Sequence, residues 1–327
     1  QTCVAPGLID SHVHPVFGDW TPRQGQLGWI DSTMHGGVTT MISAGEVHLP
    51  GRPKDIVGLK ALAITAQRSF ANFRPGGVKV LAGAPVIEKG MTESDFQELA
   101  AAGVSLLGEV GLGSVKAGYE AKEMVAWARK HGIQSTIHTG GPSIPGSGLI
   151  DKDVVLEADA DVIGHINGGH TSLPEAHVCD LCEKSSRAIE IVHNGNERAA
   201  LYTLRLAKEM NQLARVILGT DAPAGLGVQP LGIARMVSMR MSSTLISTSI
   251  SSASGMIATV AVDVWMRPLV SVTGTRCTRC TPDSNLRRAN TSRSKRAALC
   301  ECSRHPCRSA ARFSIAWPVV SSRKNSS

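Results

Sequence analysis

Over roughly the first 240 residues, short runs of β-branched and other apolar residues alternate with longer amphipathic stretches. This alternation is typical of βα units arranged around a parallel sheet. We predict eight strands, each followed by a helical stretch, with a repeat of roughly 25 to 30 residues. The predicted strands cover residues 8–12, 38–43, 78–82, 105–109, 135–138, 162–165, 189–193 and 216–221.

Helix boundary signals occur between these strands. The segment Thr92-Glu93-Ser94-Asp95 has a capping pattern that opens a helix over 92–102, and His131-Gly132 closes a helix over 120–130. The last predicted helix runs from 230 to about 241. An open doubly wound sheet fits the same alternation with fewer units, but eight units favour an α/β fold of the (β/α)8 barrel type, which typically needs about 250 residues.

The pattern changes after Arg240. Residues 242–254 form a Ser/Thr run, and 276–312 follow neither a helical nor a strand period for more than a few residues. From Met241 onward there are 13 Lys and Arg against three acidic residues, so the whole net charge of +7 arises in this part. We therefore divide the chain into a barrel, 1–240, and a Ser/Arg/Cys-rich tail, 241–327.

The tail is so polar that it can bury little apolar surface. This burial would not offset the conformational entropy that the tail would lose on folding, so we expect it to be disordered. The abrupt change within one helix indicates a reading-frame shift in the gene. Two alternatives stay open: a basic nucleic-acid-binding arm, or a zinc-binding module. The module would use Cys277, Cys280, Cys300, Cys302, His305 and Cys307.

Residues that can bind metal ions stand at the ends of five predicted strands. In a parallel barrel the carboxyl ends of the strands form the active site. His12 and His14, two apart on an extended chain, face the same side and can bind one ion. A single strand-end histidine is more often a core or surface residue, but packing does not explain six candidates in barrel order. The other four are Glu109, His138, His165 and Asp221.

Four imidazoles and two carboxylates suit two borderline divalent ions such as Zn²⁺ or Fe²⁺, and Glu109 could bridge them. Such a pair of ions activates water at neutral pH and polarises a carbonyl group. The residue pattern therefore predicts a binuclear metal-dependent hydrolase.

Three segments, 6–14, 34–40 and 219–223, resemble the amidohydrolase superfamily. The resemblance implies a metal-dependent hydrolase barrel accompanied by a small β-sandwich domain, most of which we expect this chain to lack. It also implies that His12, His14 and Asp221 bind the first metal ion. By the same resemblance His138 and His165 bind the second, Glu109 bridges the two, and the ions are zinc and iron.

A narrower resemblance rests on the segments 51–55, 108–113, 138–146 and 165–169. They are similar to superfamily members that convert 6-oxo-1,4,5,6-tetrahydronicotinate to 2-formylglutarate and ammonia. The resemblance implies hydrolysis of a cyclic amide, in which Asp221 moves a proton from the attacking water to the departing nitrogen. Two alternatives stay open: an amidohydrolase acting on another cyclic amide or an N-acyl amino acid, and an inactive metal-binding barrel.

The substrate's carboxylate should need a cationic partner. Arg52 and Lys54, in the loop after the second strand, are candidates, although both could be solvated loop charges. His193 ends the seventh strand and could contact substrate or pack at the barrel rim. Cys179 and Cys182 lie in one helix without a second pair nearby, which favours a structural over a redox role.

The expected partner is a small-molecule substrate, with no nucleic acid and no membrane. No run approaches the roughly 20 apolar residues that span a bilayer, and the start of the chain lacks a secretory signal, so we expect a cytoplasmic protein. Without the sandwich domain, apolar surface on the barrel flank would be exposed, which favours a homo-oligomer.

Overall fold

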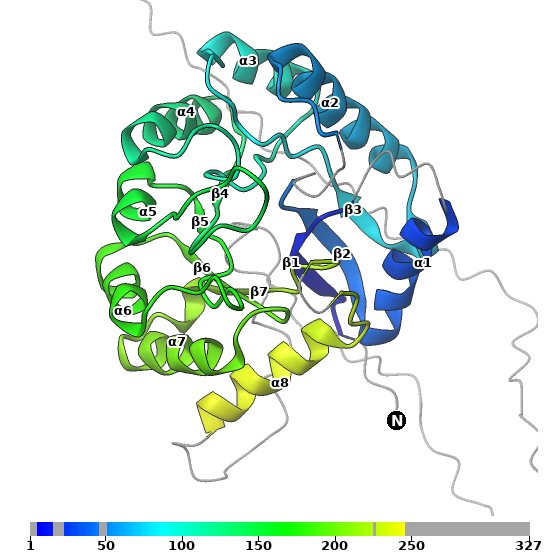
Figure 1. Ribbon diagram of the computed structural model, residues 1–327. Coiled ribbons are helices and arrows are strands. Elements are labelled where there is room, and N and C mark those ends of the chain that lie inside the picture. The colour runs from blue at the N-terminus through cyan, green and yellow to red at the C-terminus, as the bar shows by residue number, and fades with distance from the viewer. Residues whose placement is uncertain (1–4, 16–22, 46–50, 225–226, 246–327) are drawn as a thin grey trace, which may run out of the picture. The chain divides into compact units, whose positions relative to one another are not determined.

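Short parallel strands and helices alternate along the chain in the computed structural model, which describes residues 5–15, 23–45, 51–224 and 227–245 (Figure 1). The strands of this described part are β1 (Leu8–Val13), β2 (Val38–Ser43), β3 (Lys79–Leu81), β4 (Thr136–Ile137), β5 (Val162–Ile163), β6 (Ala188–Val192) and β7 (Val216–Gly219). Its α-helices are α1 (Arg23–Thr33), α2 (Ile56–Asn72), α3 (Glu93–Ala101), α4 (Gly118–Lys130), α5 (Lys152–Ala158), α6 (Glu175–Lys184), α7 (Glu197–Glu209) and α8 (Gly232–Leu245). Short 3-10 helices cover Met34–Gly36, Pro75–Gly77 and Leu213–Arg215.

The strands form two parallel sheets, in the orders β1-β2-β3 and β4-β5-β6-β7. Beyond the end of β7, the Asp221 backbone N–H donates to His12 O at 2.8 Å, and the His14 N–H donates to Ala222 O at 2.8 Å. These bonds join the first strand to the last. Figure 1 shows the helices in a ring outside the strands, so the predicted (β/α)8 barrel is confirmed.

The fourth predicted strand, 105–109, is the exception, because it is not a continuous strand. It makes only isolated parallel bridges, Leu106 with Gln134 and Val110 with Ile137. On its other side the Glu109 N–H donates to Ala44 O at 2.9 Å. The segment therefore occupies the fourth position of the barrel without a regular ladder.

The helices pack on the strands through apolar faces with helical spacing. In α7 the buried positions Ala200, Leu204 and Ala207 recur at intervals of three and four. The predicted capping pattern is confirmed at α3, where the Thr92 side chain and the Asp95 side chain each bind the other residue's backbone. Sequence and local geometry thus agree on where this helix begins.

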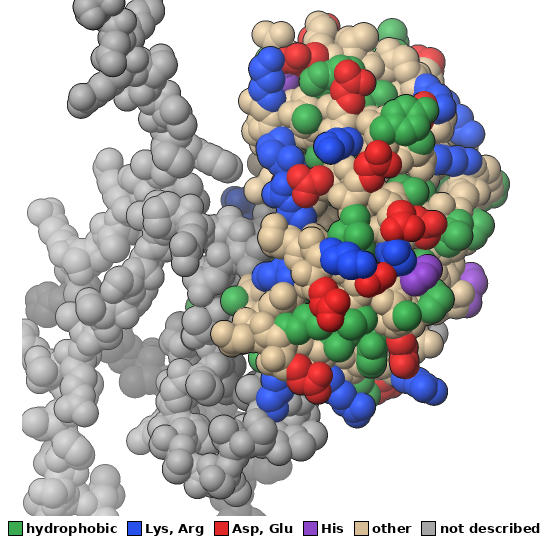
Figure 2. Space-filling view, turned by 90° about the vertical axis from the view of Figure 1, so that its left-hand side faces the viewer, with side chains coloured by type: hydrophobic (Ala, Val, Ile, Leu, Met, Phe, Trp, Pro, Cys, Tyr) green, Lys and Arg blue, Asp and Glu red, His purple; other side chains and the backbone are tan. Residues whose placement is uncertain are grey.

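The last helix, α8, continues to Leu245, so the proposed boundary at residue 240 falls inside it. Residues 246–327, with the Cys/His pattern of the tail, lie outside the described residues. Among the described helices none is both long and apolar enough to cross a bilayer. Figure 2 shows one face, over α4 to α6, on which positive and negative side chains are interspersed rather than separated.

Candidate metal centre

The structure brings all six predicted ligand candidates into one cluster. Five of them are buried, and Asp221 is the most exposed, with 20% of its side chain accessible. The ligand atoms form two overlapping groups, each within 4.8 Å: His12 with Glu109 and His165, and His12 with His14 and Asp221. His12 belongs to both groups.

His14 is oriented by the backbone. Its Nδ1–H donates to Gly45 O at 2.8 Å, which turns Nε2 toward the carboxylates. That nitrogen lies 3.1 Å from Asp221 Oδ1 and 3.7 Å from Glu109 Oε2. A carbonyl partner of this kind fixes the tautomer of a metal-binding histidine.

Glu109 stands at the centre of the group that contains His165, with His138 beside it. Its Oε1 lies 2.5 Å from His165 Nε2 and 3.2 Å from His138 Nδ1. The other ring nitrogen of His138 donates to Gly141 O at 2.8 Å, so Nδ1 is the nitrogen left for a metal ion. Glu109 thus faces both groups of histidines, as a bridging carboxylate must.

His12 carries the clearest sign that an ion belongs here. Its Nε2 is buried and has no hydrogen-bond partner among the described residues, although it lies 3.9 Å from Glu109 Oε1 and 3.8 Å from Asp221 Oδ1. A buried nitrogen rarely stays without a partner. The imidazole and carboxylate donors fit borderline divalent cations, so the residues present fit the two ions that the sequence implies.

The cluster shifts the pKa values of its own members. Burial opposes the charge on His12, but Glu190, together with Asp221 and Glu109, outweighs burial and raises the His12 pKa to about 10. Burial would raise the Glu109 pKa, yet His165 and His138 hold it well below its usual range. The Asp221 pKa is likewise lowered, against burial, by His14 and His12. The metal-free site therefore holds protons that a cation would displace.

Two cluster members have unusual backbone conformations. Asp221 has φ +60° and His165 has φ +26°, in a region that non-glycine residues rarely adopt. Such strain is concentrated at functional sites. Here it turns two side chains toward the cluster just beyond β5 and β7.

Two buried carboxylates at the site were not predicted from the sequence. Glu190, in the middle of β6, binds His12 Nδ1 at 2.6 Å. Asp10, two residues before His12, accepts hydrogen bonds from the backbone and hydroxyl of Thr220 at 2.8 and 2.6 Å. Burial is the largest influence on Asp10 and raises its pKa to about 7.

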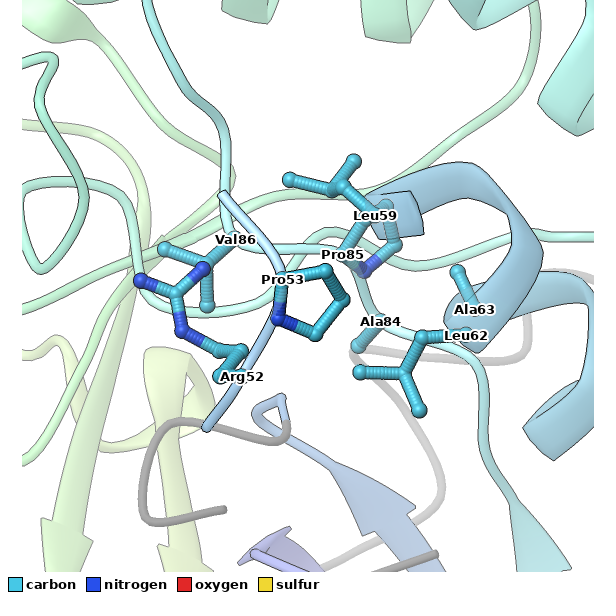
Figure 3. Close-up of a pocket in the computed structure, with 8 residues that line it drawn as sticks. All are labelled: Arg52, Pro53, Leu59, Leu62, Ala63, Ala84, Pro85 and Val86. Atoms are coloured by element: carbon cyan, nitrogen blue, oxygen red, sulfur yellow. The ribbon is translucent and has the colours of Figure 1, made fainter. Parts of the chain in front are cut away.

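The predicted substrate-binding residues are not part of this cluster. Arg52 is half-buried and lines a small pocket together with Pro53, Pro85 and Val86 (Figure 3). Its Nη2 donates to Glu88 Oε1 at 3.0 Å, while its Nη1 is buried without a partner in the part of the chain that the structure describes. Lys54 is exposed.

His193 lines a cavity of about 80 Å³ between α7 and α8. A Cβ added to Gly232 would lie 3.2 Å from its Cγ, so the ring packs closely against the start of α8. Both roles left open for His193, substrate contact and packing at the rim, stay predictions.

Cys179 and Cys182 are free thiols on α6. Burial raises the pKa of Cys182 to about 11, and it also raises the pKa of Cys179. Reactive cysteines need a lowered pKa, so this environment agrees with a structural role.

A parallel barrel whose strand ends gather histidines and carboxylates is the arrangement that the resemblance to the amidohydrolase superfamily implied. No family model matches the chain. The chain is similar to enamidase from Eubacterium barkeri, with 53% identity over 232 residues, which cover 71% of this chain and 60% of that protein. The crystal structure of enamidase, described as a new member of the amidohydrolase superfamily, matches with a TM-score of 0.68 and 51% identity.

That structural match covers 72% of this chain and 61% of the enamidase chain. The chain thus spans about three fifths of the length of the relative it matches. The expected resemblance to the superfamily is confirmed, and so is the narrower likeness to enamidase.

Proposed function

We propose that this chain is a binuclear metal-dependent amidohydrolase that hydrolyses a cyclic amide, with 6-oxo-1,4,5,6-tetrahydronicotinate as its substrate. Two waters are consumed. The first cleaves the ring C–N bond, and the second converts the resulting enamine to 2-formylglutarate and ammonia. The proposal is carried by one observation: His12 Nε2 is buried and unpartnered between Glu109 and Asp221. Similarity to enamidase supports the choice of substrate.

His12, His14 and Asp221 would hold one cation and His138 and His165 the other, with Glu109 between them. We take the ions to be zinc and iron. When bound, such a pair supplies activated water and a polarised amide carbonyl. We take Asp221 as the catalytic residue: it is the most accessible carboxylate of the cluster, and its lowered pKa keeps it in the ionised form that can accept a proton. It would deliver that proton to the departing ring nitrogen.

We further propose that Arg52 and Lys54 bind the substrate's carboxylate, with His193 as a third contact. The buried and unpartnered Nη1 of Arg52 supports its role, whereas its pairing with Glu88 offsets part of its charge. Replacing Arg52 with Ala should raise KM for the anionic lactam about tenfold, the loss expected for one charge-assisted hydrogen bond. The KM for a neutral lactam of the same ring size is the control. An equal rise for both substrates, or for neither, contradicts the role.

The proposal also covers the localisation, partners, oligomeric state and domain boundaries of the protein. We propose a cytoplasmic homo-oligomer that binds a small molecule and no nucleic acid, with the barrel in 1–240 and a divergent tail in 241–327. The interspersed charges of the face in Figure 2 support the absence of a nucleic-acid surface there.

Ammonia release from a panel of cyclic amides tests the activity, with the purified chain assayed before and after chelation and again after zinc and iron are restored. We expect turnover of the tetrahydronicotinate lactam, its loss on chelation and its recovery with metal. If the protein hydrolyses only another lactam or an N-acyl amino acid, the proposed substrate is wrong and that compound class replaces it. Tightly bound metal without ammonia from any substrate would identify an inactive metal-binding barrel.

A further inference from the structure

Glu190 stands out among the buried side chains next to the cluster. It lies in the middle of β6, is 1% exposed, and comes from a strand that supplies none of the six ligand candidates. Its Oε1 accepts a hydrogen bond from Ser11 Oγ at 2.5 Å. Its Oε2 lies 2.6 Å from His12 Nδ1 and 3.3 Å from the His165 backbone nitrogen.

We propose that Glu190 is a positioning residue that fixes the tautomer and the orientation of His12 as a metal ligand. The inference rests on the proposed metal site. Glu190 acts through His12 and through the backbone of His165, and it does not itself contact the candidate ions.

The tautomer of His12 follows from its hydrogen bond with Glu190. A carboxylate can only accept a hydrogen bond, so Nδ1 of His12 must carry the proton that lies against Glu190. The lone pair of a neutral His12 is then on Nε2, which points at Glu109 and Asp221. Hydrogen bonding to a carboxylate also makes the imidazole a more basic ligand.

His12 has a stronger partner than its neighbours. His14 and His138 are oriented by the carbonyl oxygens of Gly45 and Gly141, which carry no net charge. Only His12 among the cluster histidines belongs to both groups of candidate ligands. A charged partner therefore acts on the one cluster imidazole that belongs to both groups.

The charges of the site also support a role for Glu190. Two divalent cations carry four positive charges, whereas Glu109 and Asp221 supply two negative charges. Buried charge is costly unless it is paired. Glu190 adds a third carboxylate, one hydrogen bond behind His12 and buried with it.

The test follows release of Co²⁺ from the loaded protein into excess chelator, together with the visible absorption of bound Co²⁺. Glu190→Gln keeps an acceptor of the same shape but removes the charge, and Glu190→Met removes both. Ser11→Ala removes only the hydrogen bond on the far oxygen. Thr203→Val is the matched control, because Thr203 is fully buried in α7 and contacts no cluster residue in the hydrogen bonds of the described part.

We expect Glu190→Gln and Glu190→Met to release Co²⁺ about 10- to 100-fold faster, the usual effect of losing such a partner, with Met the more severe. Their Co²⁺ absorption should shift, whereas Ser11→Ala and Thr203→Val should keep the wild-type spectrum and release rate. A folded Glu190 variant with wild-type rate and spectrum overturns the inference. A wild-type protein that retains no Co²⁺ overturns the metal site itself, which is a distinguishable failure.

Discussion

At the scale of single residues, the sequence identified the side chains at strand tips and missed those inside strands. The six ligand candidates could be found because the end of each strand in a parallel barrel faces the active site. Glu190 and Asp10 lie two or more residues before the last position of their predicted strands. The sequence did carry a sign of both: an acidic residue within a run of apolar strand residues. A buried carboxylate is costly unless it has partners.

Gly45 gives a prediction at this scale, because its carbonyl orients His14. Its φ is +109°, and an added Cβ would lie 2.9 Å from Gly108 Cα and 3.0 Å from Ala84 O. Gly45→Ala should therefore lower the free energy of unfolding by more than the roughly 1–3 kcal/mol of a strained φ alone. It should also speed Co²⁺ loss by displacing the acceptor of His14. Urea unfolding of the metal-free protein and chelator-driven release measure the two effects.

Gly77→Ala is the matched control. Gly77 also has a positive φ, +94°, but its Cβ would meet no atom within 4 Å. It should show the φ cost without faster Co²⁺ loss. Equal effects of the two substitutions on both measurements would contradict the role assigned to Gly45.

At the scale of elements, apolar runs predicted where strands lie but not how regular they are. The segment 105–109 has strand-like composition, yet a Cβ on Gly108 would lie 2.8 Å from Ala84 O. The backbones here approach too closely for a regular ladder with side chains on both faces. Helix ends were predicted better, because capping at Thr92 is a local signal that does not depend on distant packing.

Asp159, which ends α5, gives the prediction at this scale. It has φ +51°, and its carboxylate accepts hydrogen bonds from Arg187 Nε at 2.7 Å and Nη2 at 2.5 Å. The hydrogen bond from Arg187 lowers the Asp159 pKa below its ordinary 3.8. The ionised form therefore stabilises the fold above that ordinary pKa, and the contribution is lost as pH falls through the lowered value. Asp159→Asn tolerates the same backbone but carries no charge.

At neutral pH this variant should be less stable by about 1 kcal/mol or less, because the pair is partly exposed. The difference should vanish in strong acid. Melting curves of the metal-free protein across acidic pH measure it. The control is Asp153→Asn, which is expected to change little, because among the described residues its carboxylate forms an ion pair only with the neighbouring Lys152. A stability gap that persists below the lowered pKa would be inconsistent with this account.

At the scale of the whole molecule, the site and the barrel depend on each other. The cluster residues come from strand ends spread around the ring, and those of β1 and of the segment after β7 lie across the junction where the barrel closes. Sequence could predict this arrangement because barrel order dictates which strand ends meet. It could not predict how the part of enamidase that this chain does not match contributes, because 40% of that protein has no counterpart in the alignment.

Because the candidate ligands join both ends of the barrel, bound metal should stabilise the entire fold, and the gain should depend on pH. In the metal-free protein the His12 pKa is raised from 6.5 to about 10, so protonated His12 stabilises that form fully below 6.5 and loses this effect as pH rises through about 10. A cation needs the neutral imidazole and must displace the proton within this window. The metal-induced gain in unfolding free energy should therefore grow with pH from 6.5 toward 10, by up to about 1.4 kcal/mol per pH unit for each proton displaced.

Denaturant unfolding with and without zinc at a buffered free concentration measures the gain. Thr203→Val should lower the stability of both forms and leave the slope unchanged, whereas a gain that is flat across this pH range would mean that His12 is not a ligand.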